Sequence, residues 1–445
     1  MSDPLLPIIE TSGITRRDFI RLMTISGTGL LAGCAANPVT GRQQLMLVSE
    51  DQEIAMDRQN SPHQFSADYG AVQDGALNAY VDQTGKGLAA KSHRPQMPYS
   101  FRVVNANYVN AYAFPGGSIA CTRGILLSLD NEAELAALLG HELGHVNARH
   151  TAEQMSKGML TQAFVGGLSA LAGTGGATLG NLAAQLGMIG AGALLASYSR
   201  GNEREADALG MEYMVRSRYS PEGMINLMDM LRGQSKRNPS VIELMFSTHP
   251  MSDERYRTAV DNARSKYRSA AGLPVHRERF MDNTARLRTR KGAIEEMQKA
   301  ERLMAENKFG EADTRLKDAL KMSPHDYTCL VLLSKSKLVQ KKYREGTEFA
   351  ERAERAYPQE AQAYYLSGIG NLISKDFGGA YREFDAYEKR LPGNPNTIFF
   401  KGYSQEMMEH KNKAAREYQR YLQAVQQGKM ARHAYTKLKE WGYAK

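Results

Sequence analysis

Apolar residues recur at helical spacing in the stretch that follows Asn131. Its leucines stand three or four positions apart and so share one face of a helix; they are Leu135, Leu138, Leu139 and Leu143. Asn131 is a favourable N-cap, and Glu134 three residues later completes a capping-box pattern. We therefore predict a helix that begins after Asn131 and buries its leucine face.

Two stretches before this helix show the alternation of apolar and polar positions that is typical of β-strands. They are residues 99–104 and residues 110–121. We predict a mainly α fold of the α+β kind, in which a small antiparallel sheet lies beside the leucine-rich helix.

The C-terminal part of the chain repeats with a period of 34 residues. Large residues, small residues and prolines each keep this step: Phe309, Tyr343 and Phe377, with Lys411 in register; Ala312, Gly346, Ala380 and Ala414; and Pro324, Pro358 and Pro392. Such a period, with small residues at a helix crossing and proline at the end of the unit, resembles tetratricopeptide repeats. The resemblance implies an α-solenoid of helix pairs with a concave face for protein partners.

Several aromatic residues fall in the first helices of these repeats, and the sequence leaves two roles open for them. They either fill the core of the solenoid, which is the commoner case, or line a peptide-binding face; they are Tyr364, Tyr365, Phe399, Phe400 and Tyr403.

The leucine-rich helix also carries the motif His141-Glu142-x-x-His145. Residues four apart leave the same side of a helix, so the two neutral imidazoles can bind one zinc ion. Glu142 is placed beside the first histidine to act as general base on a water molecule. A surface helix with two histidines is the plainer interpretation, but unpaired imidazoles in an apolar stretch are costly.

A catalytic zinc ion needs a third protein ligand. We reject His150, because its spacing from His145 is one residue short of the metzincin pattern. Glu203 and Asp207 stand four apart on a predicted helix and share a face. Glu203 would then be the ligand, and Asp207 would accept a hydrogen bond from a ligating histidine, which fixes its tautomer. Taken alone, a solvated acidic helix start with Arg204 as an ion-pair partner is the favoured interpretation of these residues.

His-Glu-x-x-His followed by Glu-x-x-Ala-Asp resembles the zinc metallopeptidase family of the CAAX prenyl protease, HtpX and OMA. Residues 110–119 contain an Asn-Ala-x-Ala-x-Pro-Gly-Gly pattern that matches a further motif of this family. With its repeats, the chain is most similar to the periplasmic β-barrel-assembly-enhancing proteases. The resemblance covers roughly residues 37 to 255. It implies that Glu203 is a zinc ligand, with Glu205 as the runner-up.

Thr248-His249-Pro250, followed by Arg255, resembles another motif of the family and implies a loop near the zinc ion. Proline at position 250 holds His249 in an extended or turn conformation. His249 then either donates a hydrogen bond to the oxyanion of the scissile carbonyl or occupies the open zinc position as a latch. We favour the latch, and we place Arg255 in support of the site.

An extended substrate can pair with the edge of a sheet in zinc proteases of this layout. The candidate substrate edge strand comprises Gly116, Gly117, Ser118 and Ile119. The glycine pair would allow a close approach of the substrate backbone.

Composition narrows the choice of partners. The chain has a formal net charge of +9, and 28 Lys+Arg against 21 Asp+Glu lie after residue 290. Both signs are interleaved along the predicted helices, which favours a solvated face, and nothing resembles a nucleic-acid-binding module. The three cysteines, Cys34, Cys121 and Cys329, cannot form a disulfide framework.

Residues 1–33 predict an export signal. Thr15-Arg16-Arg17-Asp18-Phe19-Ile20 resembles the twin-arginine consensus, and Leu31-Ala32-Gly33-Cys34 resembles a bacterial lipobox. The lipobox resemblance implies that Cys34 is lipidated and anchors a periplasmic lipoprotein in the membrane. Ala35 favours sorting to the outer membrane. An uncleaved anchor is the alternative, but the apolar run is short of the roughly 20 residues that span a bilayer.

The segment from Gly158 to Ser199 has no charged residue. Two membrane-spanning helices are one interpretation, but polar residues interrupt every run of about 20 positions. We prefer a helical hairpin over the cleft.

These signals divide the chain into a signal peptide (1–33), a tether (34–48), a metallopeptidase domain (49–270), a linker (271–290) and a repeat domain (291–445). We expect a zinc endopeptidase with one Zn²⁺ per chain, and the family resemblance implies that it acts in the bacterial envelope and cleaves misfolded or stalled envelope and outer-membrane proteins. An envelope chaperone or assembly scaffold with latent proteolysis is the alternative.

Overall fold

The computed structural model describes residues 34–41, 43–156, 198–237 and 239–444. These residues divide into two compact units. The N-terminal unit runs to Gln298 and the repeat unit begins at Lys299, so the boundary falls inside helix α14 (Lys291–Ala305).

A three-stranded mixed sheet supports the N-terminal unit. Its strands β3 (Ser100–Val104), β4 (Ala111–Ala113) and β5 (Ser118–Thr122) lie in the order β3-β5-β4. β4 is antiparallel to β5, as predicted, but β3 is parallel to β5, so the purely antiparallel sheet was wrong. The predicted second strand is in fact two, because the chain turns at residues 114–117 and Gly117 takes a φ of +103° there.

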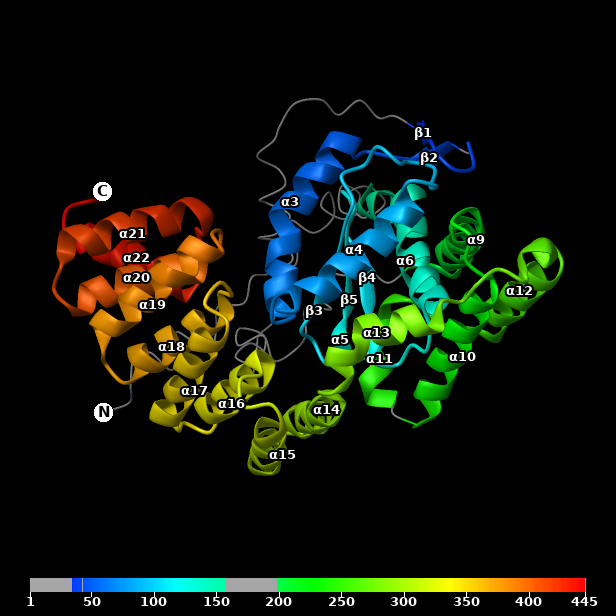
Figure 1. The fold of residues 1–445 in the computed structure, drawn as a ribbon. Helices are drawn as coiled ribbons and strands as arrows, with labels where there is room; N and C mark the ends of the chain where they lie inside the picture. The colour runs from blue at the N-terminus through cyan, green and yellow to red at the C-terminus, as the bar shows by residue number, and fades with distance from the viewer. Residues whose placement is uncertain (1–33, 42, 157–197, 238, 445) are drawn as a thin grey trace. The chain divides into compact units, whose positions relative to one another are not determined.

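Helices surround this sheet (Figure 1). In chain order they are α3 (Glu50–Ala67), α4 (Gly75–Ala89), α5 (Arg123–Leu126), α6 (Glu132–Asn147), α9 (Arg200–Arg216), α10 (Glu222–Arg237), α11 (Pro239–Thr248), α12 (Asp253–Arg264), the short 3₁₀ turn η2 (Arg268–Ala270) and α13 (Arg277–Arg288). Helix α6 packs against α4, α9, α10 and the strand β4, and every one of its residues is buried.

The helix predicted after Asn131 is α6. The side-chain Oδ1 of Asn131 accepts a hydrogen bond of 3.0 Å from the backbone N–H of Glu134. This cap satisfies one of the free N–H groups at the helix start, and Glu132 and Glu134 place negative charge where the helix dipole favours it.

Small residues let α6 and α9 approach closely. A Cβ atom added at Gly144 would lie 2.8 Å from the Cα of Ala206, and one at Gly140 would lie 3.0 Å from the carbonyl oxygen of Gly210. The two backbones therefore touch along this face. This contact brings the histidine motif of α6 next to the acidic residues of α9.

The predicted tether at residues 34–48 is wrong, because this stretch packs on the N-terminal unit. Strands β1 (Cys34–Ala36) and β2 (Gln43–Leu45) form an antiparallel hairpin, which we call the N-terminal hairpin. Met46 and Val48 then bury their side chains against Ala152. Met46 and Val48 thus anchor residues 34–48 on the N-terminal unit, whereas a tether would remain in solvent.

The predicted linker at residues 271–290 also proves to be structured. Helix α13 packs on α4 and α6 and buries Phe280 and Leu287. Arg279 on α13 forms an ion pair with Glu132 in the first turn of α6. Residues 271–290 therefore contain a helix that packs on the N-terminal unit.

The repeat unit consists of helix pairs, as predicted. Its helices after α14 are α15 (Phe309–Met322), α16 (Tyr327–Val339), α17 (Tyr343–Ala356), α18 (Gln362–Ile373), α19 (Phe377–Arg390), α20 (Pro395–Met407), α21 (Lys411–Ala424) and α22 (Lys429–Glu440). The four residues of the first 34-residue column begin α15, α17, α19 and α21. The small-residue column is buried in these helices, as expected at a helix crossing.

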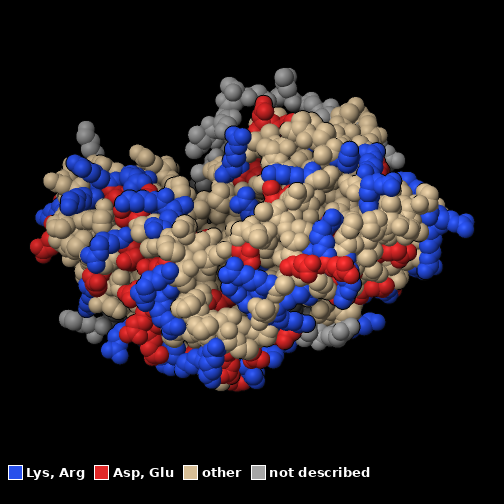
Figure 2. Space-filling view, in the orientation of Figure 1, with Lys and Arg blue, Asp and Glu red and all other residues tan. Residues whose placement is uncertain are grey.

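The aromatic residues of the repeats are mainly core. Tyr365, Phe399, Phe400 and Tyr403 are buried in one cluster of α18 to α22, and Tyr364 packs on its side while partly exposed. Lysines and arginines alternate with aspartates and glutamates over the visible face of this unit, which supports the prediction of a solvated face (Figure 2). In the described part of the chain, no helix has the length and apolar character to cross a membrane.

Candidate metal centre

Four buried side chains converge in the N-terminal unit. His141 and His145 come from α6, Glu203 from α9, and His249 from the residue after α11; one donor atom of each lies within 4.8 Å of the others. The Nε2 atoms of His141 and His145 are 3.0 Å apart. They lie 3.6 Å and 3.3 Å from the two carboxylate oxygens of Glu203.

His249 lies among these donors and not merely near them. Its Nδ1 atom is 3.1 Å from the Oε1 of Glu203 and 3.4 Å from the Nε2 of His141. The backbone N–H of His249 still donates to the carbonyl of Met245, so the end of α11 fixes the position of the ring.

Glu142 points to the same place and has an unusual environment. Both carboxylate oxygens are buried, and neither has a hydrogen-bond partner among the described residues. The Nε2 of His249, 3.8 Å from its Oε1, is outside hydrogen-bonding distance. Burial raises the pKa of Glu142 above its usual value.

This donor set fits a zinc ion. Imidazole nitrogens and a carboxylate are the ligands that Zn²⁺ takes in catalytic sites. Burial also lowers the pKa of His145 well below its usual value, which keeps the ring neutral as a ligand requires. The unpartnered oxygens of Glu142 are the orphaned buried acceptors that a water molecule beside a metal would satisfy.

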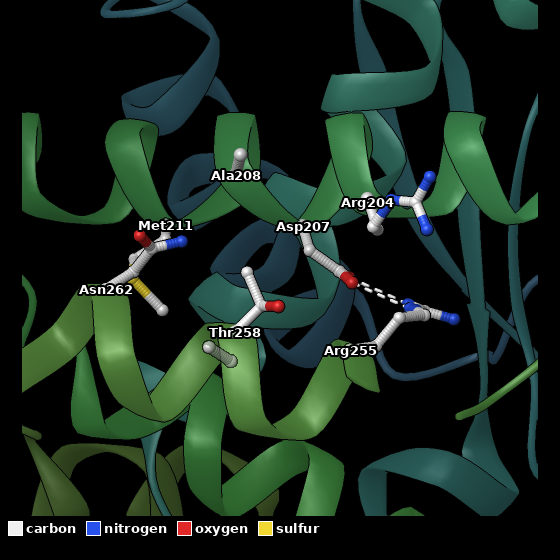
Figure 3. Close-up of a pocket in the computed structure, with 8 residues that line it drawn as sticks. Arg204, Asp207, Ala208, Met211, Arg255, Thr258 and Asn262 are labelled. Carbon is white, nitrogen blue, oxygen red and sulfur yellow. Dashed lines mark hydrogen bonds and ion pairs between the residues drawn. The ribbon is translucent and has the colours of Figure 1, made fainter. Parts of the chain in front are cut away.

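The far side of the cluster is held by Asp207 and Arg255. Asp207 Oδ1 lies 2.9 Å from Nδ1 of His141, and Arg255 donates to both oxygens of Asp207 at 2.7 Å. Figure 3 shows the contact between Asp207 on α9 and Arg255 on α12, and both residues line a small pocket. Burial opposes the charge of Asp207, but the Arg255 guanidinium outweighs it and lowers the pKa of this carboxyl.

Arg255 also contacts Glu203, with Nη1 2.6 Å from Oε2. One guanidinium therefore joins a candidate ligand to the residue that orients another. Asp207 and Arg255 lie where the sequence placed them, next to His141 and the His249 loop.

Sequence reasoning missed two residues beside His145. The ring of Tyr198 stacks on that of His145, with centroids 3.7 Å apart, and Nδ1 of His150 lies 3.0 Å from Nδ1 of His145. The rejection of His150 as a ligand agrees with the structure, in which it lies outside the cluster of four. Arg149 has a φ of +59°, which turns the chain at the end of α6 and returns His150 to His145. Helical periodicity alone gives no signal for such a turn.

The predicted substrate edge strand, residues 116–119, is wrong. Gly116 and Gly117 belong to the turn between β4 and β5, Ser118 and Ile119 begin β5, which is the central strand, and Ile119 is fully buried. The glycines serve internal packing: a Cβ at Gly116 would lie 2.6 Å from the Cβ of Asp57, and the backbone N–H of Ser118 donates to that Asp57 carboxylate. Apolar alternation identified a strand but not its neighbours.

Three predictions lie outside the described residues. They are the signal peptide at residues 1–33, the hairpin expected between Gly158 and Ser199, of which only the last two residues are described, and the modification of the Cys34 side chain.

Two histidines of a His-Glu-x-x-His helix and a glutamate from a second helix form the ligand arrangement of a zinc metallopeptidase. Comparison with known families agrees with this class. Residues 75–263 match the sequence model of Peptidase family M48, and this part of the chain is an M48 domain.

Known relatives support the same family. The beta-barrel assembly-enhancing protease of Yersinia pestis is 32% identical over 242 residues, which cover 53% of this chain and 49% of the relative. The mitochondrial metalloendopeptidase OMA1 of Schizosaccharomyces pombe is 32% identical over 229 residues, which cover 49% of this chain and 64% of the relative. The chain thus spans about half the length of the first of these relatives.

The repeats have structural neighbours of lower similarity. YrrB, described as a TPR protein with an unusual peptide-binding site, is 13% identical, with a TM-score of 0.31 over 46% of this chain and 97% of its own. The repeat architecture described above rests on the 34-residue register of the helices and not on this likeness.

Proposed function

We propose that this protein is a zinc-dependent endopeptidase. The observation that carries the proposal is the convergence of His141, His145 and Glu203 next to a buried Glu142 whose oxygens have no partner among the described residues. Three neutral or anionic donors with a carboxylate beside them are what metal-assisted hydrolysis of a peptide bond requires.

Each residue then has a role in cleavage. His141, His145 and Glu203 would hold the zinc ion, which when bound supplies a Lewis acid for the scissile carbonyl and lowers the pKa of water. Glu142 takes the proton of the attacking water and passes it to the leaving amine. Burial raises the pKa of Glu142 and so brings it nearer to the working pH, where a general base transfers protons most efficiently.

His249 fills the fourth position of the cluster, and we propose that it acts as a latch. If all four residues held one ion, they would leave no open position for water, which a catalytic zinc site needs. His249 follows α11 directly and lies beside a pocket lined by flexible methionines, among them Met228, Met245 and Met251. A shift of this loop would open the position without moving α6 or α9.

We propose the outer edge of β4 as the place where substrate binds, in place of the β5 strand. The backbone N–H of Thr122 donates to the carbonyl of Asn110, and the backbone N–H of Phe114 donates to the carbonyl of Ser118. Because backbone hydrogen bonds in an antiparallel pair involve every second residue, the N–H and C=O groups of Ala111 and Ala113 point away from β5. β4 packs against α6, which carries Glu142. The opposite edge, β3, is covered by side chains of α4: Asn78 and Asp82 accept its N–H groups at 3.0 Å.

For the setting, we propose a bacterial envelope lipoprotein that is anchored through Cys34 and acts on misfolded or stalled envelope and outer-membrane proteins. The lipobox and twin-arginine resemblance support the compartment, and the names of the bacterial relatives support the substrate class. The repeats would bind protein partners. A chaperone or scaffold with latent proteolysis is the second candidate, and the position of His249 inside the cluster favours latency.

Zinc analysis and casein digestion on protein that lacks residues 1–34 test this proposal. We expect one zinc ion per chain and casein cleavage that stops when a chelator removes the metal. Protein that binds zinc but never cleaves, even after His249 is replaced, would favour the scaffold. Protein that binds no zinc would contradict the proposed centre.

A further inference from the structure

We propose that His150 is a positioning residue, which holds the ligand His145 through its Nδ1 atom and is itself held by Glu205. This inference rests on the proposed zinc centre and adds residues to it that neither the motif nor the predicted ligand set includes. Nδ1 of His150 lies 3.0 Å from Nδ1 of His145, and Nε2 of His150 lies 3.4 Å from Oε2 of Glu205.

The hydrogen bonds between His145, His150 and Glu205 determine which ring nitrogen of each histidine carries the proton. His145 presents Nε2 to the cluster, so its own proton must be on Nδ1. That N–H donates to Nδ1 of His150, which therefore carries its proton on Nε2 and donates it to the carboxylate of Glu205. No other assignment of two neutral rings leaves Nε2 of His145 free for a metal and gives both N–H groups an acceptor here.

The two imidazoles of the centre are thus supported in different ways. Nδ1 of His141 meets a carboxylate, Asp207, whose charge is held by Arg255. Nδ1 of His145 meets a second imidazole, and the carboxylate stands one ring further away. Partners of this kind fix ring orientation and tautomer, and they commonly change metal affinity by ~10–100-fold.

Local structure holds His150 in place. The left-handed turn at Arg149 returns the chain after α6, and the His150 ring is 1% exposed. The Arg149 side chain donates to Glu53 and to the carbonyl of Val48, which secures the turn. A residue fixed on both sides in this way is suited to orient a neighbour.

The N-terminal hairpin completes this support. Asn37 in its turn donates to Oε1 of Glu205 at 3.4 Å and to the carbonyl of Ala148 at 3.5 Å. Gln44 on β2 donates to the same carbonyl at 3.3 Å. The hairpin that begins at Cys34 therefore reaches, through Glu205 and His150, a ligand of the centre.

Zinc affinity of the full chain, measured by competition with a chromophoric chelator, tests the assignment. His150→Leu keeps the bulk and removes the acceptor, and we expect zinc to bind about 10–100-fold more weakly. His150→Asn places an amide oxygen near the lost Nδ1, so it should restore most of that affinity. The visible spectrum of bound Co²⁺ should shift in His150→Leu and return toward the native spectrum in His150→Asn.

A second pair of variants avoids the buried core. Glu205 is 29% exposed at its side chain, so Glu205→Ala should fold normally and weaken zinc binding, while Glu205→Gln, which retains an acceptor oxygen, should weaken it less. If native protein binds zinc and all four variants bind it equally well, His150 has no positioning role. Equal losses in His150→Leu and His150→Asn would make the residue merely structural. A native chain that binds no zinc would instead overturn the proposed function, and this inference with it.

Discussion

The Nδ1 atom of His249 lies 3.1 Å from the Oε1 atom of Glu203, which places a loop histidine in direct contact with a candidate metal ligand. We expect His249→Ala to speed casein cleavage several-fold, because the fourth position of the cluster becomes available to water. The same change removes a donor, so zinc should bind more weakly. Rates of the native protein and the variant, both at saturating zinc, provide the measurement.

The alternative role for His249 predicts the opposite sign. Loss of an oxyanion donor slows catalysis, typically by about 10²–10³-fold. A slower variant at saturating zinc would therefore contradict the latch, and an unchanged rate would exclude both roles.

Arg255 should be essential for the fold of the site. It pairs with Glu203 and Asp207, all three side chains being largely buried. Arg255→Met leaves two carboxylates without their cation, and loss of one partner in a buried ion pair costs about 3–5 kcal/mol. We expect the free energy of unfolding to fall by that order in urea, with a smaller loss in Arg255→Lys. An equally stable Arg255→Met protein would show that the ion pairs are not formed in solution.

The close approach of α6 and α9 makes a prediction that reverses the usual rule for glycine. Alanine in place of a helical glycine normally stabilises by about 1 kcal/mol. Gly144→Ala should instead destabilise by about 1–3 kcal/mol and weaken zinc binding, because its Cβ would overlap the backbone of Ala206 and displace Glu203.

Gly87 provides the matched control. It lies inside α4, and a Cβ there would have no neighbour within 4 Å. Gly87→Ala should leave zinc affinity unchanged and keep or raise stability in the same urea titration. If both alanine variants behave alike, α6 and α9 do not pack as closely as described.

Much of this site could be predicted from the sequence, because the residues concerned lie close together along the chain. The spacing of His141 and His145, and of Glu203 and Asp207, predicts shared helix faces, because one turn of helix separates each pair. The 34-residue register likewise predicted repeated helix pairs, since each unit is built from its own short stretch of chain, and the structure places the residues of its first column at the start of four helices.

What the sequence did not predict depends on contacts between distant segments. β3 pairs in parallel with β5, and alternation within a strand says nothing about which neighbour it takes. Residues 116–119 therefore looked like an edge strand, but Ser118 and Ile119 lie in the central strand β5 and the two glycines lie in the turn before it. His150 is five positions from His145, and only the left-handed conformation of Arg149 brings their rings together.

A partly buried carboxyl in the repeat unit should make its stability depend on pH. Burial, with the nearby charges of Glu383 and Glu351, raises the pKa of Glu354 from 4.5 to about 7, although its bond from Ser367 opposes the shift. Between these two pKa values the folded state binds a proton that the unfolded state has lost. Stability should therefore fall as the pH rises from about 4.5 to about 7, and change little from this group above pH 7.

Glu354→Gln removes the titrating group, so its melting temperature should exceed that of the native protein near pH 7.5 and match it more closely near pH 5. Glu348→Gln, on the exposed side of the same helix α17, serves as the control. A Glu354→Gln protein whose difference from native is the same at both pH values would contradict the raised pKa.

The central claim is that Glu142 activates water beside a metal held by His141, His145 and Glu203. The most direct measurement compares Glu142→Gln with native protein for zinc content, thermal unfolding and casein cleavage. The amide keeps the shape of a side chain that has no hydrogen-bond partner in the described structure, so zinc content and fold should be retained. Loss of a general base should reduce cleavage by about 10²–10⁴-fold. A folded, zinc-loaded Glu142→Gln protein that digests casein at the native rate would contradict the account.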